Sequence, residues 1–121
     1  MEKIVLNMVK LLLIHMKENN ILEINLDDFK ESFFKFKNSE EYGKFFYSYI
    51  YDENCLCQKF ERELNTLTKN NQIFKYNKYI YIYTINTECK SHFSDELNNL
   101  VDKMVNDFVK FNMEKIKVKA I

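Results

Sequence analysis

The sequence has no proline, no tryptophan and one glycine, Gly43, among its 121 residues. Proline and glycine are the strongest local signals for turns and loops, so their scarcity excludes a loop-rich chain and predicts helices with one tight hairpin. Net charge is also absent, because 18 basic residues balance 18 acidic ones. This balance excludes a histone-like protein that coats nucleic acid by bulk charge. Hydrophobic residues make up 46% of the chain, and we expect residues 1–121 to form one domain.

Cysteine and long apolar runs are scarce as well. The chain has Cys55, Cys57 and Cys89, and an odd number of cysteines without a secretory signal predicts reduced thiols in a cytoplasmic protein. The apolar run at residues 11–14 ends at His15 and is too short to span a membrane. We therefore expect no association with membranes.

Motifs of known enzymes are missing too. The sequence has no nucleophile elbow, no P-loop and no His-Glu zinc motif. Two acidic pairs, Asp27 with Asp28 and Glu40 with Glu41, are better explained as helix starts than as catalysts. The sequence thus predicts neither an enzyme nor a bound cofactor.

What is present is helical periodicity, with one stretch typical of a hairpin. Helices are expected at residues 2–18, 27–37, 39–51, 54–69 and 92–115, a short strand at 21–25 and the hairpin at 72–85. Ser39 is a candidate N-cap for the third helix, and Ser91 or Ser94 for the last. The first helix is apolar nearly all round, which predicts burial on more than one side. The fold class is therefore mainly α with one β-hairpin.

Residues 56–85 carry a more specific pattern. A helix with Phe60, Leu64 and Leu67 on one face, together with Leu56, ends at the pair Asn70-Asn71 and leads into a hairpin that begins at Ile73. This stretch resembles the recognition helix and wing of winged helix-turn-helix proteins, and the order of elements over residues 1–90 is similar to theirs. The chain departs from the family in having Asn71 where a glycine is usual, and two helices before the recognition helix where one is usual.

The resemblance implies binding of double-stranded DNA. The residues expected to contact DNA are Gln58, Lys59, Arg62, Asn65, Thr66 and Lys69 on the helix, with Lys75, Asn77 and Lys78 on the wing. Arginine can grip guanine and glutamine or asparagine can grip adenine in the major groove, while lysine meets phosphate. Residues 54–90 are also the only electropositive segment, with six basic and three acidic residues.

An alternative explanation of this helix needs no DNA. Every amphipathic helix has a polar outer face, and Glu61 and Glu63 on the same helix would repel phosphate. The second hypothesis is therefore a protein-interaction module that has the winged scaffold and does not bind DNA.

The last expected helix suggests an oligomer. Its apolar positions step by 4, 3, 4 and 3, a heptad seam formed by Leu97, Val101, Met104, Phe108 and Phe111. Together with the first helix, this seam predicts a homodimer, although both helices could instead pack on the core of a monomer. Small dimeric winged helices act as transcriptional repressors or, like the TubR-like centromere binders, as plasmid or phage segregation factors, and both roles fit.

Two features of the central region have competing explanations. A Cys-x-Cys pair near a wing is similar to that of the metal-sensing ArsR family, but Cys55 and Cys57 lie too close to the wing, and we expect half-buried structural thiols and no metal site. In the second hairpin strand, Tyr79, Tyr81 and Tyr83 share one face. They could stack on single-stranded bases, although packing on a neighbouring helix is the favoured expectation.

Overall fold

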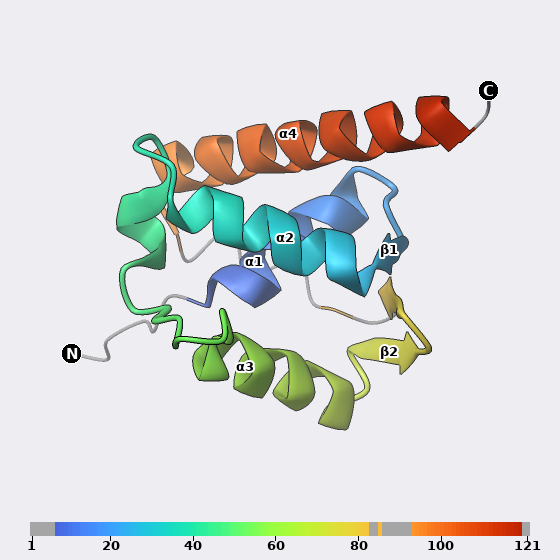
Figure 1. The fold of residues 1–121 in the computed structure, drawn as a ribbon, viewed down its shortest axis with the longest axis horizontal. Coiled ribbons are helices and arrows are strands. Elements are labelled where there is room, and N and C mark those ends of the chain that lie inside the picture. Colours follow the sequence, from blue (N-terminus) through green and yellow to red (C-terminus); the bar gives the residue numbers. More distant parts are fainter. Residues whose placement is uncertain (1–6, 83–84, 86–92, 120–121) are drawn as a thin grey trace.

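The computed structural model describes residues 7–82, 85 and 93–119, with side chains described up to residue 112. Over these residues the chain is mainly helical, with a small three-stranded antiparallel sheet. The elements are α1 (Met8–Glu18), β1 (Glu23–Asn25), α2 (Leu26–Lys37), the 3-10 helix η1 (Gly43–Phe46), α3 (Gln58–Lys69), β2 (Ile73–Tyr76), β3 (Tyr79–Ile82) and α4 (Asp95–Lys119). Figure 1 shows α4 and α3 on opposite sides, with α1 and α2 between them and the sheet at one end.

Helix α1 is the centre of the core. It begins after Asn7, whose side chain accepts a hydrogen bond from the backbone N–H of Lys10 at 2.8 Å. Every residue from Met8 to Met16 except Lys10 is buried, because α1 packs against both α4 and α3. The expected burial on more than one side is confirmed, and the covering elements belong to the same chain. The part of the predicted helix before Asn7 lies outside the described residues.

Helix α2 confirms the helix expected at 27–37. Asn25 is its N-cap and accepts from the backbone N–H of Asp28 at 3.0 Å. Asp27 and Asp28 occupy the first turn, where negative side chains suit the positive end of the helix dipole. The buried face carries Phe29, Phe33 and Phe36 toward the core.

The prediction of a helix at residues 39–51 is wrong, since only the short helix η1 forms there. The Ser39 hydroxyl does accept from the backbone N–H of Glu41 at 3.1 Å, as an N-cap would. A continuous helix fails because the Phe46 carbonyl accepts instead from the Tyr49 N–H at 3.0 Å and from the Lys37 ammonium at 3.4 Å. Gly43 passes so close to the Lys37 carbonyl that an added Cβ would lie 2.9 Å from its oxygen.

Helix α3 is shorter than the helix expected at 54–69. The backbone of Cys55 is left-handed, with φ 60°, and the Asp52 carboxylate accepts from the N–H groups of Asn54 at 2.8 Å and Leu56 at 2.9 Å. These bonds fold residues 52–56 into a loop before the helix begins at Gln58.

Two expectations for this loop therefore need correction. Leu56 is exposed and does not belong to the core face, whereas Phe60, Leu64 and Leu67 are buried as predicted. The two thiols precede α3: Cys55 is exposed and Cys57 is buried, so neither is half-buried.

Asparagines with left-handed backbones stand where glycine would be usual. Asn71, at φ 58°, follows α3, and the next residue, Gln72, donates its N–H to the Leu67 carbonyl at 3.0 Å. Asn20, at φ 63°, follows α1 in the same way. Asn77, at φ 56°, lies in the tight turn between β2 and β3, where positive φ is required. The expected hairpin and its turn are confirmed over residues 73–82, whereas residues 83 and 84 of the expected second strand lie outside the described residues.

The sheet has the order β1-β3-β2, so the strand expected near residues 21–25 pairs with the hairpin. One face of the sheet is buried through Ile24, Ile73, Ile80 and Ile82. The pairings Phe74 with Tyr81 and Tyr76 with Tyr79 place aromatic rings on the other face. Tyr79 is exposed, so its expected packing on a helix is wrong; Tyr81 is half-buried, and Tyr83 lies outside the described residues.

Helix α4 begins after Ser94, whose hydroxyl accepts from the backbone N–H of Leu97 at 3.2 Å. The seam residues Leu97, Val101, Met104 and Phe108 are buried within the single chain. This corrects the expected dimer interface, because α1 and α2 of the same chain already cover these four side chains. Only Phe111 of the seam is exposed. The buried His15 ring links α1 to α4, with Nδ1 at 2.6 Å from Asp102 Oδ1 and Nε2 at 3.0 Å from Asn98 Oδ1.

The hydroxyl group of Tyr49 is hydrogen-bonded to both α1 and α3, and its removal tests how much this link contributes to stability. The fully buried Tyr49 accepts from the Met8 N–H at 2.8 Å and donates to the Glu63 carboxylate. Tyr49→Phe leaves that N–H without an acceptor, and we expect a loss of about 1–3 kcal/mol in the free energy of unfolding, measured by urea denaturation. Tyr47→Phe is the matched control, because Tyr47 is 87% exposed; equal stability of the two variants would contradict this role.

Candidate nucleic-acid interface

The outer face of α3 carries polar side chains in a regular row. Its buried residues Phe60, Leu64 and Leu67 fix the inward face, because they repeat at helical spacing. The side chains that this leaves exposed are Gln58, Arg62, Asn65, Thr66 and Lys69. Five of the six residues expected on the helix therefore lie together on one accessible surface.

Two of the expected contact residues also make bonds within the chain. The Lys59 ammonium donates to the Ser48 hydroxyl and lies 4.6 Å from the centre of the Tyr49 ring, so Lys59 is half-buried at the edge of the row. The Thr66 hydroxyl donates to the Arg62 carbonyl at 2.9 Å and keeps its lone pairs for an outside donor. Arg62 is thus the most accessible cation in the first two turns of α3.

The acidic residues of α3, Glu61 and Glu63, are half-buried beside this row. Glu61 forms an ion pair with Lys30 of α2 at 2.9 Å. Glu63 accepts from the Tyr49 hydroxyl, with its second oxygen at 3.0 Å. Each carboxylate therefore has a partner inside the chain: the Lys30 ammonium offsets the charge of Glu61, while Glu63, bonded to a neutral hydroxyl, lies near the positive charges of Lys59 and Arg62.

The environment of Glu63 shifts its protonation. Burial raises the pKa of the Glu63 carboxyl above its ordinary value, and this outweighs the hydrogen bond from Tyr49 and the positive charges of Lys59 and Arg62, which lower it. Burial and the bond to Glu63 also raise the pKa of the Tyr49 hydroxyl, so Tyr49 keeps its proton and remains the donor.

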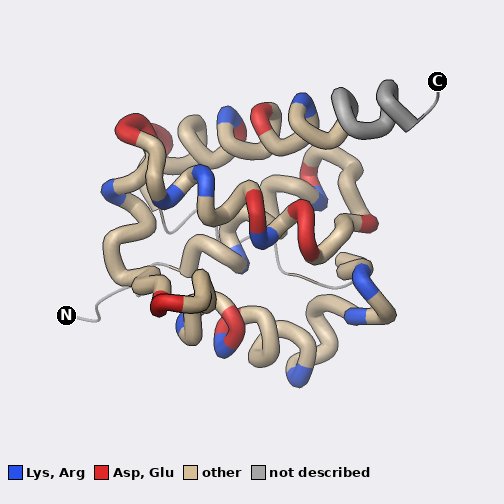
Figure 2. The backbone as a smooth tube through the Cα atoms, viewed as in Figure 1, with Lys and Arg blue, Asp and Glu red and all other residues tan. Residues whose placement is uncertain are grey.

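The hairpin extends the row beyond the end of α3. Strand β2 packs against α3, and Lys75, Asn77 and Lys78 are all exposed on the hairpin. Figure 2 shows Lys and Arg positions along α3 and on the hairpin at the same edge of the molecule. We call the surface formed by Gln58, Arg62, Asn65, Lys69, Lys75 and Lys78 the basic face.

A hollow of about 390 Å³ adjoins the basic face at the start of α1. It is lined by Asn7, Lys59, Arg62, Glu63 and Thr66. Asn7, Ser48 and Tyr49 were not expected near α3, because no local pattern relates residues so far apart in the sequence. Buried tyrosines with one polar end need a partner, which is the one signal that Tyr49 offered.

The described residues do not support a metal site or a membrane-spanning helix. No three His, Cys, Asp or Glu side chains in the ranges 7–82, 85 and 93–112 lie close enough together to hold a metal ion. Among the helices described, none has the length and apolar character needed to cross a membrane.

Comparison with models of known protein families, with curated proteins and with solved structures gives no match for this chain.

The raised pKa of Glu63 predicts a pH dependence of stability. A carboxyl whose pKa is raised on folding binds its proton more tightly in the folded chain, so its contribution to stability is present at acid pH and is lost as the pH rises from the ordinary value of 4.5. Glu63→Gln should therefore lose less stability than the wild type between acid and neutral pH in urea denaturation. Glu53→Gln, at an exposed loop position, is the control, and parallel wild-type and Glu63→Gln profiles would contradict the prediction.

Proposed function

We propose that this protein is a winged helix that binds double-stranded DNA through the basic face. One observation carries the proposal: Glu61 and Glu63 have partners inside the chain, while Arg62 and its polar neighbours remain exposed on α3. The order of α1, β1, α2, α3 and the hairpin supports the resemblance to winged helices. The residues between η1 and α3 are the main difference from it.

The chemistry of each part of the basic face suits one part of a duplex. Arg62 has the donor pair that guanine accepts in the major groove, and Gln58 and Asn65 have the donor and acceptor pair that adenine requires. Lys69, Lys75 and Lys78 are suited to phosphates on either side, which fix the position of the protein without specifying sequence. A transcriptional regulator and a plasmid or phage segregation factor both need such a surface, and the neighbouring genes would distinguish these roles.

The DNA proposal predicts different effects for the helix and the wing. Arg62→Ala and Lys78→Ala should both weaken binding, but only Arg62→Ala should relax sequence preference, at a cost of about 1–3 kcal/mol against the preferred site. The measurement is fluorescence anisotropy with the upstream intergenic DNA of the protein's own gene and a scrambled duplex, at low and physiological salt.

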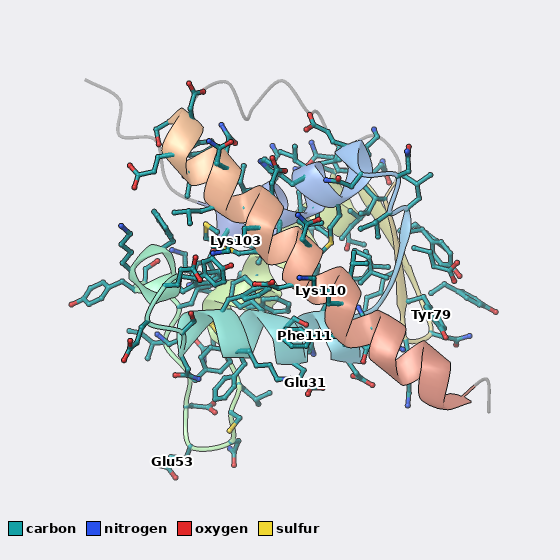
Figure 3. The ribbon with its side chains drawn as sticks, turned by 90° about the horizontal axis from the view of Figure 1, so that it is seen from above. Glu31, Glu53, Tyr79, Lys103, Lys110 and Phe111 are labelled. Carbon is teal, nitrogen blue, oxygen red and sulfur yellow. The ribbon has the colours of Figure 1, made fainter. Side chains whose placement is uncertain are left out.

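Lys110→Ala is the matched control for these two variants. It removes the same charge from an exposed position on α4, on the opposite side of the molecule from α3 (Figures 1 and 3). Equal effects of all three substitutions would mean that binding follows total charge, and no binding at low salt would remove the proposal.

We further propose a homodimer, which would place two basic faces about 34 Å apart on successive half-sites. Phe111 is the seam residue left exposed, with the Lys35 ammonium 4.6 Å from its ring centre. The C-terminal end of α4 extends past the other helices (Figure 1), which supports contact with a second copy there.

The homodimer proposal has a direct test. Phe111→Glu should convert the dimer to a monomer in sedimentation velocity, because a charge in an apolar contact is costly. Asn106→Glu is the control, since it adds the same charge at another exposed position of α4. A dimer that survives Phe111→Glu would exclude this interface.

A second candidate function, protein binding without DNA, is favoured by a separate groove. A groove of about 270 Å³ between α2 and α3 is lined largely by apolar groups, including Phe34, Tyr51 and Leu56. Phe34 and Leu56 are exposed there, which is typical of a partner site. In that case Arg62→Ala would have no effect on binding of the partner protein, whereas Leu56→Asp would abolish that binding.

A further inference from the structure

The outer edge of strand β2 is the side of the sheet that borders no other described strand. The sheet has the order β1-β3-β2, so β2 pairs with β3 on one side only. Figure 1 shows β2 on the side of the sheet away from β1 and α4. An open edge of this kind is a template on which another extended chain can add as a further strand.

Two hydrogen bonds show which residues of β3 face β1. The Leu26 N–H donates to the Lys78 carbonyl at 2.6 Å, and the Ile82 N–H donates to the Leu22 carbonyl at 2.9 Å. Successive residues of an antiparallel strand direct their backbone groups to opposite edges of the strand. Residues 78 and 82 therefore turn their backbone groups toward β1, and residues 79 and 81 turn theirs toward β2.

The backbone groups of Lys75 point to the outer edge of β2. The residues of β2 opposite Tyr79 and Tyr81 are Tyr76 and Phe74, whose N–H and C=O groups are directed to β3. Lys75 lies between Phe74 and Tyr76 in the strand, so its own N–H and C=O are directed away from β3. An incoming strand can donate to this carbonyl and accept from this N–H.

The side chains along the outer edge alternate between a cation and aromatic rings. Lys75 is paired with Ile80 and shares its face of the sheet, and Lys75 itself is exposed. Phe74 and Tyr76 lie on the opposite face, where they are 46% and 59% exposed. An added strand would therefore meet one positive charge on one face of the sheet and two rings on the other.

The charge near the outer edge of β2 is positive. Residues 69–82 include Lys69, Lys75 and Lys78 and no acidic residue. Glu23 belongs to β1, and β3 lies between β1 and β2. A partner strand that places a carboxylate opposite Lys75 therefore complements this edge, because residues directly opposite each other lie on the same face of the sheet.

We propose that the outer edge of β2 binds an extended segment of a partner protein as an added antiparallel strand. The segment has an acidic residue opposite Lys75 and an apolar residue on each side of it, against Phe74 and Tyr76. A second copy of the chain fits less well, because β2 has no acidic residue to place opposite Lys75. A nucleic acid fits less well too, since its phosphates offer no donor to the Lys75 carbonyl.

The proposal goes beyond duplex binding by the basic face and stands without it. The outer edge of β2 is also separate from the groove between α2 and α3, which is lined by Phe34, Tyr51 and Leu56. Lys75 is the residue that the added strand and the basic face share, so substitutions elsewhere can separate the two surfaces.

The first test is fluorescence anisotropy with a labelled peptide of about nine residues, long enough to form one strand. The peptide alternates threonine and valine and has glutamate in place of the central threonine, so that a valine flanks the glutamate on each side. A matched peptide has lysine at the centre. The glutamate peptide should bind roughly threefold tighter or more, because opposite charges across a strand pair attract and like charges repel.

Substitutions in β2 test the two kinds of contact. Lys75→Glu should reverse the preference, so that the lysine peptide binds tighter, whereas Lys110→Glu on α4 should leave the preference unchanged. Tyr76→Ala should weaken binding of both peptides by about twofold or more. Tyr47→Ala is the control for loss of an exposed ring elsewhere, since Tyr47 is 87% exposed.

Methylated peptides test the backbone pairing. N-methylation of the central glutamate removes the N–H that would donate to the Lys75 carbonyl and should abolish binding. N-methylation of a flanking valine, whose N–H would point away from β2, should leave binding intact. Equal effects of the two methylations would overturn the proposal.

Three further results would also overturn the proposal. They are no binding of the glutamate peptide, an unchanged preference in Lys75→Glu, and a wild-type dimer in sedimentation velocity that Tyr76→Ala converts to a monomer. Titration of Arg62→Ala with duplex DNA and with the glutamate peptide separates this proposal from the DNA proposal. Arg62→Ala should weaken duplex binding only, and a wild type that binds the peptide but no duplex would remove the DNA proposal alone.

Discussion

The hydroxyl of Tyr49 is the contact on which the placement of α3 depends. It accepts from the first N–H of α1 and donates to a carboxylate of α3, so it links segments 41 and 14 residues away in the sequence. A buried polar group without a partner is costly, and these groups satisfy each other only when α1, the loop after η1 and α3 are all in place. The Lys59 ammonium lies over the same ring. One side chain thus sets the position of the helix and the direction of two of its charges.

Local patterns predicted the parts of the fold that depend on local physics. Helix α2, the core face of α3 and the hairpin with Asn77 at its turn follow from periodicity and turn chemistry. The helix predicted at residues 39–51 does not form. Tyr42, Phe46 and Tyr49 are buried at spacings that fit a helix, which is why the pattern predicted one, but the backbone groups there make other hydrogen bonds. The Phe46 carbonyl, for example, accepts from Lys37, a competition that no local pattern reveals.

The candidate site divides in the same way. The row from Gln58 to Lys69 could be predicted, because the buried face of an amphipathic helix determines its outer face. The partners of Glu61 and Glu63 could not, since Lys30 and Tyr49 approach from other elements. The heptad seam of α4 shows a related limit. Its pattern predicts that one face of the helix is buried, but the pattern does not say whether the same chain or a second copy covers that face. Here α1 and α2 of the same chain cover it.

The three left-handed asparagines have a consequence for the denatured chain. Asn20, Asn71 and Asn77 stand at turns where glycine would fit without strain. Glycine would also give the unfolded chain more conformations to lose on folding, whereas a residue with a side chain limits them. The chain has one glycine and no proline, so neither the extra freedom of glycine nor the restriction of proline contributes much to its unfolded state. At these three turns the native backbone therefore carries slight strain, while the entropy lost locally on folding is lower than it would be with glycine.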